Sequence, residues 1–598
     1  MRQAGVVSDD RTLSQLKNSP SQTGPASMQK VTLTFVVGTF IVFLAYRMTI
    51  GIDLSDESYY VSFIDGWLKT GIQASSTLGL HQTAALLVYP FAKLFTVLTG
   101  SVDGLVLFLR FIYLLMACAA GSCFYKLVRE THGRTVATFA SLTVVTFIPF
   151  SLPSPSYNTI GMLSMICAFS SCGVFFLRRS SEHAQAPPHW RWAVGSAFAW
   201  TVSVIAYPPL FLVQVILLLG LMFANRKNVP FGSLIKYLFL CVFTQAAGLA
   251  ILVGTYGIGR MYDMFQFTNA SLQVTSGIGE KLKYFGNVFL LHPWFGLASA
   301  MSLLVGIALT KKHRPLAIDY VIVLIIFSFL VLSLLAGPAL YTQSHDFVFL
   351  LAILGAPLCI SAQGTPPGTK TTPLRSQIMR LLLFVGLLAG LMTSLTATNG
   401  LVNFAVGGSF AMALGITLAI PERKSTAVIA LHTLLLAGIS GLLLWSSFGF
   451  IYGEVRNPLT SDSQRVREGI FAGLLTTDQN AYAIRETSKL FSNATSSHGT
   501  IAIFGRLPGV YLLTPSKPMT LSTWDFGQQN GTFPAIEKLN ADFYAQTAHR
   551  PDILAVVSDP WTKPLSAFSQ KLVSEYRPKE RQDFGAWSIE LYVPRGIK

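Results

Sequence analysis

The stretch that decides the fold is "GIDLSDESYYVSFIDGWLKTG", residues 51–71. It follows directly after a strongly apolar run at about 31–50. Three acids, Asp53, Asp56 and Glu57, therefore stand just beyond an apolar segment that is long enough to cross a bilayer. Only fourteen acids occur in the first 453 residues, so three of them together mark this stretch for attention.

The residues after Glu57 have the spacing of an amphipathic helix. Its apolar positions follow the i, i+3, i+4, i+7, i+8 rule, and they are Tyr60, Phe63, Ile64, Trp67 and Leu68. This spacing predicts a helix that lies in the membrane interface, with its aromatic rings at headgroup level. Ser55 is the expected N-cap and Gly71 the expected stop.

The composition of the whole chain indicates a membrane protein. Of its 598 residues 51% are apolar and 12% charged, and the mean hydropathy is +0.51. Apolar runs of roughly 15–24 residues alternate with short basic loops, which is the pattern of a polytopic helical protein. All six cysteines fall inside apolar runs without metal-ligand spacing, so we interpret them as packing residues.

The net charge of +16 is a consequence of membrane topology. Residues 454–598 carry 16 Lys and Arg against 14 Asp and Glu, whereas the other 453 residues carry 28 against 14. The excess lies mostly in short loops between apolar runs, where it sets the orientation in the bilayer. Nucleic acid is therefore excluded as a partner, and the lipid bilayer is expected as one.

Loop charge predicts the topology. Loops without Lys or Arg are expected outside the cell, and loops with basic clusters are expected in the cytoplasm. The basic clusters lie at 126–134, 178–191, 226–227, 311–314, 370–375 and 423–424. The segment at 82–99 would invert this alternation as a span, and it contains Pro90 and Lys93. We interpret it as a second interfacial helix. Thirteen spans are then predicted, at about 31–50, 104–126, 135–150, 160–177, 193–207, 209–224, 234–254, 286–309, 315–337, 347–361, 378–396, 400–420 and 425–449.

The predicted domains follow from these spans. Residues 1–29 are expected as a disordered cytoplasmic tail, 30–450 as the membrane domain with its first external loop at 51–103, and 451–598 as an external α/β domain. In that last domain, alternating patterns predict helices at 481–491, 533–546 and 564–576 and strands at 500–505, 552–559 and 586–594. A Gly- and Tyr-rich external loop is expected at 255–285.

Four features of this region together resemble the GT-C class of membrane glycosyltransferases. They are the run "DESYY" after the first span, an amphipathic helix, a second apolar helix with a Tyr-Pro, and an Arg that enters the next span. Within that class the chain is similar to the protein O-mannosyltransferases and the bacterial enzymes that transfer aminoarabinose to lipid A. The resemblance implies about thirteen spans, two interfacial helices in the first external loop, a bacterial inner membrane and a periplasmic C-terminal domain. It also implies a polyprenyl-phosphate-linked sugar as donor and a glycan, lipid or protein as acceptor.

The same resemblance implies roles for the acid pair. Asp56 is expected as the catalytic base, with Glu57 beside it. The sequence departs from the family pattern at two places, where His81 and Asn158 stand in loops that commonly carry an acid. A divalent metal ion is the one cofactor left open, with Asp56, Glu57 and His81 as its candidate ligands. The alternative for the acid pair is a simple interaction with the helix dipole.

Cations and polar groups in external segments complete the expected site. Arg110 is the first candidate for the donor phosphate, and pairing with Asp103 is its equally weighted alternative. Further phosphate candidates are Arg260, Lys281 and Lys283, each with a solvated surface role as the alternative. The candidate substrate contacts are Tyr60, His81, Asn158, His345 and Asp346, of which the last two are expected in a short external loop.

Other functions compete with sugar transfer from a lipid donor. An O-antigen ligase or polymerase is also polytopic with external loops, but those enzymes would lead with Arg- and His-rich loops. A transporter or flippase would show repeated halves or ionisable residues deep in a span, and the sequence shows neither. A non-catalytic partner with a binding domain is the remaining alternative.

Overall fold

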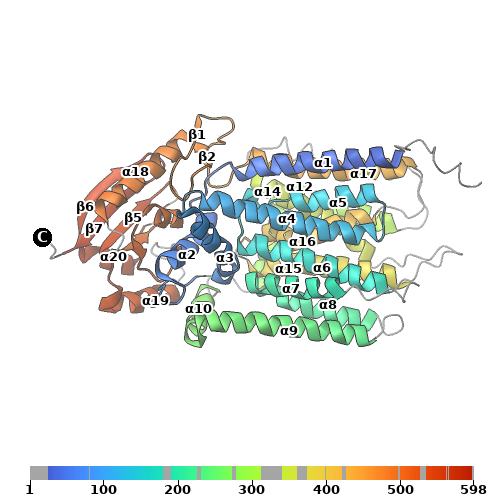
Figure 1. The fold of residues 1–598 in the computed structure, drawn as a ribbon, viewed down its shortest axis with the longest axis horizontal. Coiled ribbons are helices and arrows are strands. Elements are labelled where there is room, and N and C mark those ends of the chain that lie inside the picture. The colour runs from blue at the N-terminus through green and yellow to red at the C-terminus, as the bar shows by residue number, and fades with distance from the viewer. Residues whose placement is uncertain are drawn as a thin grey trace, which may run out of the picture.

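The structure is a computed structural model. It describes residues 25–79, 81–179, 190–224, 231–272, 278–310, 340–359, 373–397, 399–419, 426–495, 499–524, 534–560, 562 and 564–595. The expected span at 315–337 and most of the expected N-terminal tail lie outside these residues. The remainder forms a bundle of long helices that is followed by a smaller α/β unit at one end of the bundle (Figure 1).

The bundle is built from apolar helices that run roughly parallel to its long axis (Figure 1). They are α1 (Pro25–Met48), α4 (Leu105–Arg129), α5 (Arg134–Thr146), α6 (Tyr157–Arg179), α7 (Trp190–Ala206), α8 (Leu210–Ala224), α9 (Phe231–Tyr256), α12 (Pro293–Thr310), α14 (Leu340–Gly355), α15 (Pro373–Thr396), α16 (Phe404–Leu418) and α17 (Thr426–Gly449). Among the described residues, eight helices are long and apolar enough to cross a membrane, or up to nine if a bent pair counts as one span. The predicted helical membrane domain is confirmed, and the count of thirteen spans stays a prediction.

Two helices lie between the bundle and the α/β unit. They are α2 (Asp56–Thr70) and α3 (Gln82–Thr99), and both belong to the loop between the first two long helices. Gly71 ends α2 as expected, with a positive φ of 85° and its amide donating to the Trp67 carbonyl. By length and composition α3 is also one of the eight membrane-capable helices, but Figure 1 shows it at the end of the bundle beside α2.

The segment expected as a loop at 255–285 is largely helical in its described residues, 255–272 and 278–285. It contains α10 (Ile258–Leu272) and the first half of α11 (Ile278–Leu291). The region expected as one straight span from 286 is instead divided between α11 and α12 (Pro293–Thr310), and this bent pair, with an angle of 97°, has the length and composition of a span only when its two helices are taken together. His292 and Pro293 stand at this break, where proline cannot continue the preceding helix.

The C-terminal unit is an α/β layer with a five-stranded sheet of order β4-β3-β5-β7-β6. The parallel strands β3 (Thr500–Phe504), β4 (Lys517–Pro518) and β5 (Ile553–Ser558) continue into the antiparallel pair β7 (Ser588–Pro594) and β6 (Tyr576–Asp583). The helices are α18 (Asp478–Ala494), α19 (Pro534–Ala545) and α20 (Ala567–Ser574), and a small antiparallel pair is formed by β1 (Ser463–Arg465) and β2 (Leu475–Thr477). All six elements predicted from sequence are present.

One hydrophobic core unites α2, α3 and the C-terminal unit. Tyr59 and Phe63 of α2 belong to the same buried cluster as Val510 and Tyr511 of the 3₁₀ helix η4 (Pro508–Leu513) and Ile553 of β5. A separate core fills the helical bundle. The first inter-helix loop and the C-terminal unit thus fold together as one body, even though about 400 residues separate them in the chain.

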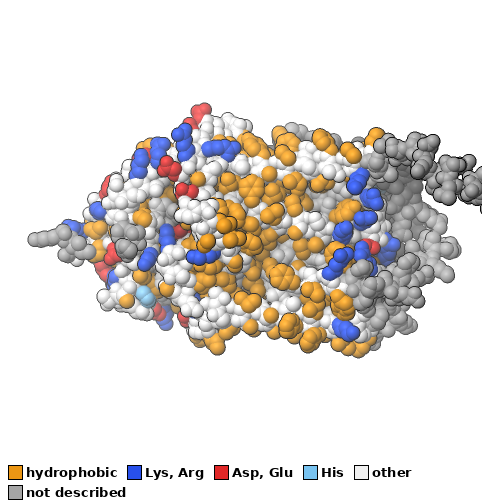
Figure 2. Space-filling model, viewed as in Figure 1, with side chains coloured by type: hydrophobic (Ala, Val, Ile, Leu, Met, Phe, Trp, Pro, Cys, Tyr) orange, Lys and Arg blue, Asp and Glu red, His pale blue; other side chains and the backbone are white. Residues whose placement is uncertain are grey.

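Charge is distributed unevenly along the long axis. On the face that Figure 2 shows, a broad apolar band crosses the bundle, and Lys and Arg side chains gather at the end that faces away from the C-terminal unit. Basic residues at helix ends account for this group: Lys126 and Arg129 in the last turn of α4, Arg134 at the start of α5, and Arg178 at the end of α6.

Candidate active site

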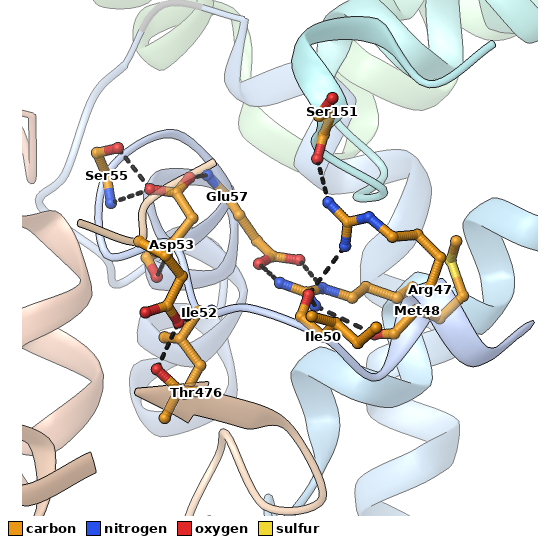
Figure 3. A network of polar contacts seen from close by, with 12 residues as sticks. Arg47, Met48, Ile50, Ile52, Asp53, Ser55, Glu57, Ser151 and Thr476 are labelled. Carbon is orange, nitrogen blue, oxygen red and sulfur yellow. Dashed lines mark hydrogen bonds and ion pairs between the residues drawn. The ribbon is translucent and has the colours of Figure 1, made fainter. Parts of the chain in front are cut away.

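The start of α2 is organised by Asp53. One carboxylate oxygen of Asp53 accepts hydrogen bonds from the Ser55 amide at 2.8 Å and the Ser55 hydroxyl at 2.5 Å, and the other accepts from the Glu57 amide at 2.7 Å (Figure 3). Ser55 stands at the N-cap position as expected, but its side chain makes no capping hydrogen bond. Asp53 satisfies the first free amides of α2 instead.

Glu57 is held by Arg110 in a buried two-pronged ion pair. Arg110 Nε and Nη2 donate to the two Glu57 carboxylate oxygens at 2.8 and 2.5 Å, and Nη1 donates to the carbonyls of Met48 and Ile50 at 3.1 Å each (Figure 3). The two side chains are 1% and 2% exposed. The alternative that Arg110 pairs with Asp103 is wrong, since Asp103 accepts from the Gly469 amide. Both oxygens of Glu57 are thus committed to one guanidinium.

A second buried arginine, Arg47, binds the same stretch of chain that leads into α2. Arg47, in the last turn of α1, donates to the carbonyls of Ser447 at 2.6 Å, Ile50 at 2.9 Å and Ser151 at 2.7 Å (Figure 3). It ties α1 to the end of α17 and to the loop before α6. Arg47 and Arg110 share the Ile50 carbonyl, so the chain leading into α2 is fixed from both sides.

Asp56 is not a member of this ion pair and is half-buried. Its Oδ2 accepts a hydrogen bond from the hydroxyl of Tyr452, which lies just beyond the end of α17. Burial raises the pKa of the Asp56 carboxyl, and the Tyr452 hydrogen bond and the positive charge of Arg506 oppose that rise. Burial, followed by the nearby Asp56 charge, raises the pKa of Asp53 to about 7. Asp56 is therefore a carboxylate with one oxygen already engaged and a raised affinity for a proton.

An aromatic and amide cluster, which we define as His81, Tyr157, Asn158, Tyr207 and Asn403, lies next to α2. The His81 ring stacks on Tyr157 with centroids 4.0 Å apart, and Tyr157 meets Tyr207 edge-on at 5.2 Å. Burial lowers the pKa of His81 to about 4, so its ring is neutral at physiological pH. The side-chain oxygen of Asn158 and both amide atoms of Asn403 are buried without a partner in hydrogen-bond geometry among the described residues.

Tyr60 links α2 to this cluster. Its ring lies 6.2 Å from that of Tyr157, and burial raises its pKa well above the ordinary tyrosine value. Four of the predicted site residues, Glu57, Tyr60, His81 and Asn158, thus lie on α2 or next to it. All of them carry neutral or paired side chains at neutral pH.

The cations expected for a phosphate bind backbone carbonyls instead. Arg260 donates to the carbonyls of Ile72 at 3.1 Å and Thr77 at 2.8 Å, and it also binds Ser75. Lys281 donates to the carbonyls of Leu395 at 2.5 Å and Ala397 at 3.2 Å, at the end of α15. Arg260 and Lys281 thus bind backbone carbonyls of neighbouring segments, as Arg110 does.

The remaining predicted residues are distributed over other elements. Lys283 is exposed on α11. His345 and Asp346 lie inside α14, so their placement in a short loop is wrong. His345 accepts from the Phe150 amide at 2.8 Å through Nε2, and its Nδ1 lies 2.7 Å from the Val402 carbonyl, so both ring nitrogens bridge backbone groups of neighbouring segments.

The candidate metal ligands do not come together as a binding set. Among the described residues no group of three or more His, Cys, Asp or Glu side chains could hold a metal ion. Glu57 is saturated by Arg110, and the His81 ring is stacked on Tyr157. The described residues therefore do not fit a metal ion that is bound by carboxylate and imidazole groups.

Three residues near the site, Tyr452, Arg506 and Asn403, were not predicted from the sequence. Tyr452 and Arg506 belong to the region that was interpreted as a separate external domain, and Asn403 stands in a short turn between α15 and α16. One signal was available: "FIYGEV" at 450–455 places a Tyr and an acid directly after the last span, on the side where the acid cluster was expected. Glu454 of this run accepts hydrogen bonds from the Ile52 amide at 3.0 Å and from Asn480 at 2.8 Å.

Comparisons with known proteins find likeness in three-dimensional structure. No protein-family model matches the chain, and no curated protein matches it. The oligosaccharyltransferase AglB of Archaeoglobus fulgidus, in complex with an inhibitory peptide and a dolichol-phosphate, is similar at a TM-score of 0.49 and 12% identity, over 95% of this chain and 75% of that one. ArnT from Cupriavidus metallidurans bound to undecaprenyl phosphate is similar at a TM-score of 0.41 and 12% identity, over 95% of this chain and 98% of that one. With TM-scores below 0.5, the site has to be interpreted from its own residues.

Proposed function

We propose that this protein is an inverting glycosyltransferase. It moves a sugar from a polyprenyl-phosphate donor to a hydroxyl of a cell-envelope acceptor, at the outer face of a bacterial inner membrane. Asp56 is the general base of the reaction. The acceptor belongs to one of three classes, a lipid-linked glycan, a lipopolysaccharide or a protein.

The observation that carries the proposal is the environment of Asp56. Its carboxylate lies at the junction of a bundle of membrane-capable helices and a polar α/β unit, and it is half-buried. Tyr452 engages Oδ2, which leaves Oδ1 to accept a proton from a substrate hydroxyl. A carboxylate with a raised pKa accepts a proton from an alcohol more readily than an ordinary aspartate does.

The proposed step is a single displacement. The acceptor oxygen forms a bond to the anomeric carbon as the bond from that carbon to the phosphate oxygen breaks. The hydroxyl proton passes to Asp56 Oδ1, and the polyprenyl phosphate leaves with the bonding electron pair. Attack occurs on the face opposite the leaving group, so the configuration at the anomeric carbon inverts.

Glu57 and Arg110 have a supporting role in this proposal. Their buried ion pair holds the first turn of α2 against the bundle, and Asp53 holds the same turn through the Glu57 amide. Positioning of this kind is what a base requires, because its oxygen must be within hydrogen-bond distance of the hydroxyl it deprotonates. Glu57 therefore acts as a positioning residue and not as a second base.

Two further features support the proposed location of the reaction. The basic helix ends lie at the end of the bundle away from the C-terminal unit (Figure 2), and by the positive-inside rule this supports an outer location for that unit and for α2 beside it. The apolar band between the two ends is the surface that a bilayer would cover. A lipid donor could then keep its tail in the membrane while its phosphate reaches the junction.

The experiment is a comparison of cell-envelope glycans by mass spectrometry. A strain that lacks the protein should lose one sugar from one envelope component, and wild-type protein should restore it. Asp56→Asn should fail to restore the sugar at normal protein levels, whereas the matched control Asp103→Asn should restore it, because Asp103 is an exposed acid of the same loop. Restoration by Asp56→Asn would refute the role of the base and favour a transporter or a non-catalytic partner.

A further inference from the structure

Helix α10 carries apolar side chains on two opposite faces. Phe267 and Ala270 are buried in an apolar cluster of the C-terminal unit. Ile258, Tyr262 and Phe265 follow one another at i, i+4 and i+7, which places them on the other side of the helix, and they are 76%, 60% and 67% exposed. An exposed group of large apolar side chains marks a surface that a partner covers.

The buried face fixes α10 to the C-terminal unit and to the loop after α2. Phe267 belongs to the same apolar cluster as Ile536 of α19. Arg260, near the start of α10, donates to the carbonyls of Ile72 at 3.1 Å and Thr77 at 2.8 Å. Because a rotation of α10 about its own axis would break these contacts, the second apolar face stays on the outside of the protein.

The length of α9 places α10 at a membrane boundary. Helix α9 is one of the membrane-capable helices, and Gly257, with a positive φ of 77°, joins it directly to α10. From Lys236, an exposed charge near the start of α9, to Tyr256 at its end, the helix rises about 30 Å, which is the thickness of the hydrocarbon core of a bilayer. Helix α10 therefore begins where α9 leaves the hydrocarbon, and Figure 1 shows it at the end of α9 next to the C-terminal unit.

The character of the exposed face favours lipid as its partner. The face continues the apolar surface of α9, on which Phe243 and Ile251 are 60% and 65% exposed. Asp263 and Gln266, which are also exposed, lie on a separate side of α10, so the apolar face itself is uncharged. Tyr262 adds a ring of the amphipathic kind that is enriched at headgroup level. An uncharged apolar face at the edge of the hydrocarbon is what an interfacial helix presents to a bilayer.

We propose that α10 is an interfacial helix that binds the leaflet on the side of the C-terminal unit and attaches that unit to the membrane. Ile258, Tyr262 and Phe265 lie among the lipid headgroups and the upper acyl chains, and the partner is phospholipid. Through Arg260 and Phe267 the same helix holds the loop after α2 and α19, so the α/β unit stays close to the membrane surface. The inference concerns membrane contact and holds whether or not the protein transfers a sugar.

Site-specific photocrosslinking to lipid tests this contact. The photoreactive amino acid p-benzoyl-phenylalanine replaces Phe265 in the full chain, which is reconstituted into liposomes of phosphatidylethanolamine and phosphatidylglycerol and irradiated. Mass spectrometry should find covalent phospholipid adducts on α10. The same replacement at Phe243 of α9 is the positive control, and at Tyr482 of α18 it is the negative control. All three are exposed aromatic positions, so the replacement disturbs no buried packing.

The adducts distinguish lipid from the other possible partners. Phospholipid adducts at Phe265 and Phe243, without adducts at Tyr482, would support the proposal. The inference is overturned if Phe243 gives lipid adducts and Phe265 gives none. It is also overturned if Phe265 crosslinks to a second copy of the chain, because the exposed face would then be a protein interface.

Two substitutions test whether the contact depends on an apolar side chain. Backbone hydrogen exchange of α10 is measured in nanodiscs of the same lipids for wild type, Phe265→Gln and Phe265→Leu, since Gln and Leu have similar helix propensities. Phe265→Gln should exchange severalfold faster in α10, because a polar side chain loses the contact with lipid, and Phe265→Leu should exchange as wild type does. Exchange in α18 should be the same in all three proteins. Equal exchange of α10 in Phe265→Gln and wild type would contradict the insertion of this residue.

Discussion

Asp56 and Glu57 are neighbours in the chain, but the structure gives them different environments. The Glu57 carboxylate is fully buried and satisfied by one arginine, whereas Asp56 keeps an oxygen available and has a proton affinity raised by partial burial. Breaking a buried ion pair typically costs about 3–5 kcal/mol, which explains how a single interaction can hold the start of α2 in register. Two adjacent acids thus differ in burial and pairing, and only Asp56 keeps an oxygen outside the hydrogen bonds described above.

The hydrogen bond from Tyr452 should tune the base. Because it stabilises the charged carboxylate, it lowers the Asp56 pKa, and Tyr452→Phe should raise that pKa. The base works only when ionised, so activity falls as the pH drops through this pKa. The acid limb of the pH–rate profile of Tyr452→Phe should therefore lie at higher pH than that of wild type.

The control for this experiment is Tyr482→Phe. Tyr482 is an exposed tyrosine on α18, and its ring lies beside Arg485 of the same helix. Its variant should reproduce the wild-type profile. An acid limb that stays in place or moves to lower pH in Tyr452→Phe would show that this hydrogen bond does not set the proton affinity of the base.

The scarcity of acids in an apolar chain drew attention to Asp56 and Glu57, and the departures from the family pattern drew attention to His81 and Asn158. Sequence reasoning could not identify partners that come from distant segments. Tyr452 lies 396 residues from Asp56, and nothing in its local pattern indicates which carboxylate it meets. The same holds for Arg110, whose choice between Asp103 and Glu57 depends on how α4 enters the bundle.

At the scale of elements, hydropathy located the long helices but not the breaks between them. Residues 255–285 are polar enough to suggest a loop, yet they form α10 and part of α11, because a helix at a membrane surface needs only one apolar face. The charged strand β6 was missed for a related reason. It is an edge strand, largely exposed, with Pro578 beside a bulge, so it lacks the alternation that identifies buried strands.

Close packing of α15 and α16 should be sensitive to a single methyl group. A β-carbon at Gly407 would lie 2.1 Å from the Ala389 carbonyl oxygen, so Gly407→Ala must push the two helices apart. Overpacking of this kind typically costs about 1–3 kcal/mol. We expect a clearly lower apparent melting temperature in detergent, followed by intrinsic fluorescence.

Gly438→Ala is the matched control, since a β-carbon at Gly438 in α17 has no neighbour within 4 Å. Its melting temperature should be unchanged or higher, because alanine is the better helix former. Equal melting temperatures for wild type and Gly407→Ala would contradict the packing described here. Asn403 stands in the turn directly before α16, so Gly407→Ala should also disturb the aromatic and amide cluster.

For the whole molecule, the asymmetry of charge predicts the orientation. The basic helix ends should face the cytoplasm and the C-terminal unit the outside. Two exposed positions test this: Lys579→Cys in the C-terminal unit and Gly133→Cys in the turn before α5. In spheroplasts, a membrane-impermeant maleimide should label Lys579→Cys at once and Gly133→Cys only after permeabilisation.

The wild-type protein is the background control for this labelling, because its native cysteines lie in the helices of the bundle. Immediate labelling of Gly133→Cys, with protection of Lys579→Cys, would reverse the orientation. Asp56 would then face the cytosol, and a reaction at the outer leaflet would be ruled out.

The overall architecture was largely accessible from sequence, because apolar run length and loop charge are properties of the chain itself. The assembly of the first loop with the C-terminal unit was not. The hydrogen bonds from Gly509 to Leu54 and from Ile52 to Glu454 join segments that are about 400 residues or more apart in the chain. The sequence pattern of neither segment indicates that the two share a hydrophobic core. The residues expected as a separate external domain therefore share an apolar core with the first loop, and the sequence pattern alone did not indicate this contact.

The most direct measurement is single-turnover sugar transfer by purified protein in proteoliposomes, from a radiolabelled polyprenyl-phosphate sugar to extracted envelope acceptors. Asp56→Asn keeps the size of the side chain and removes the base, so we expect it to slow transfer by about 10²–10⁴-fold. Asp103→Asn should transfer at the wild-type rate, and both variants should bind undecaprenyl phosphate normally. Transfer by Asp56→Asn at the wild-type rate would contradict the assignment of Asp56 as the base.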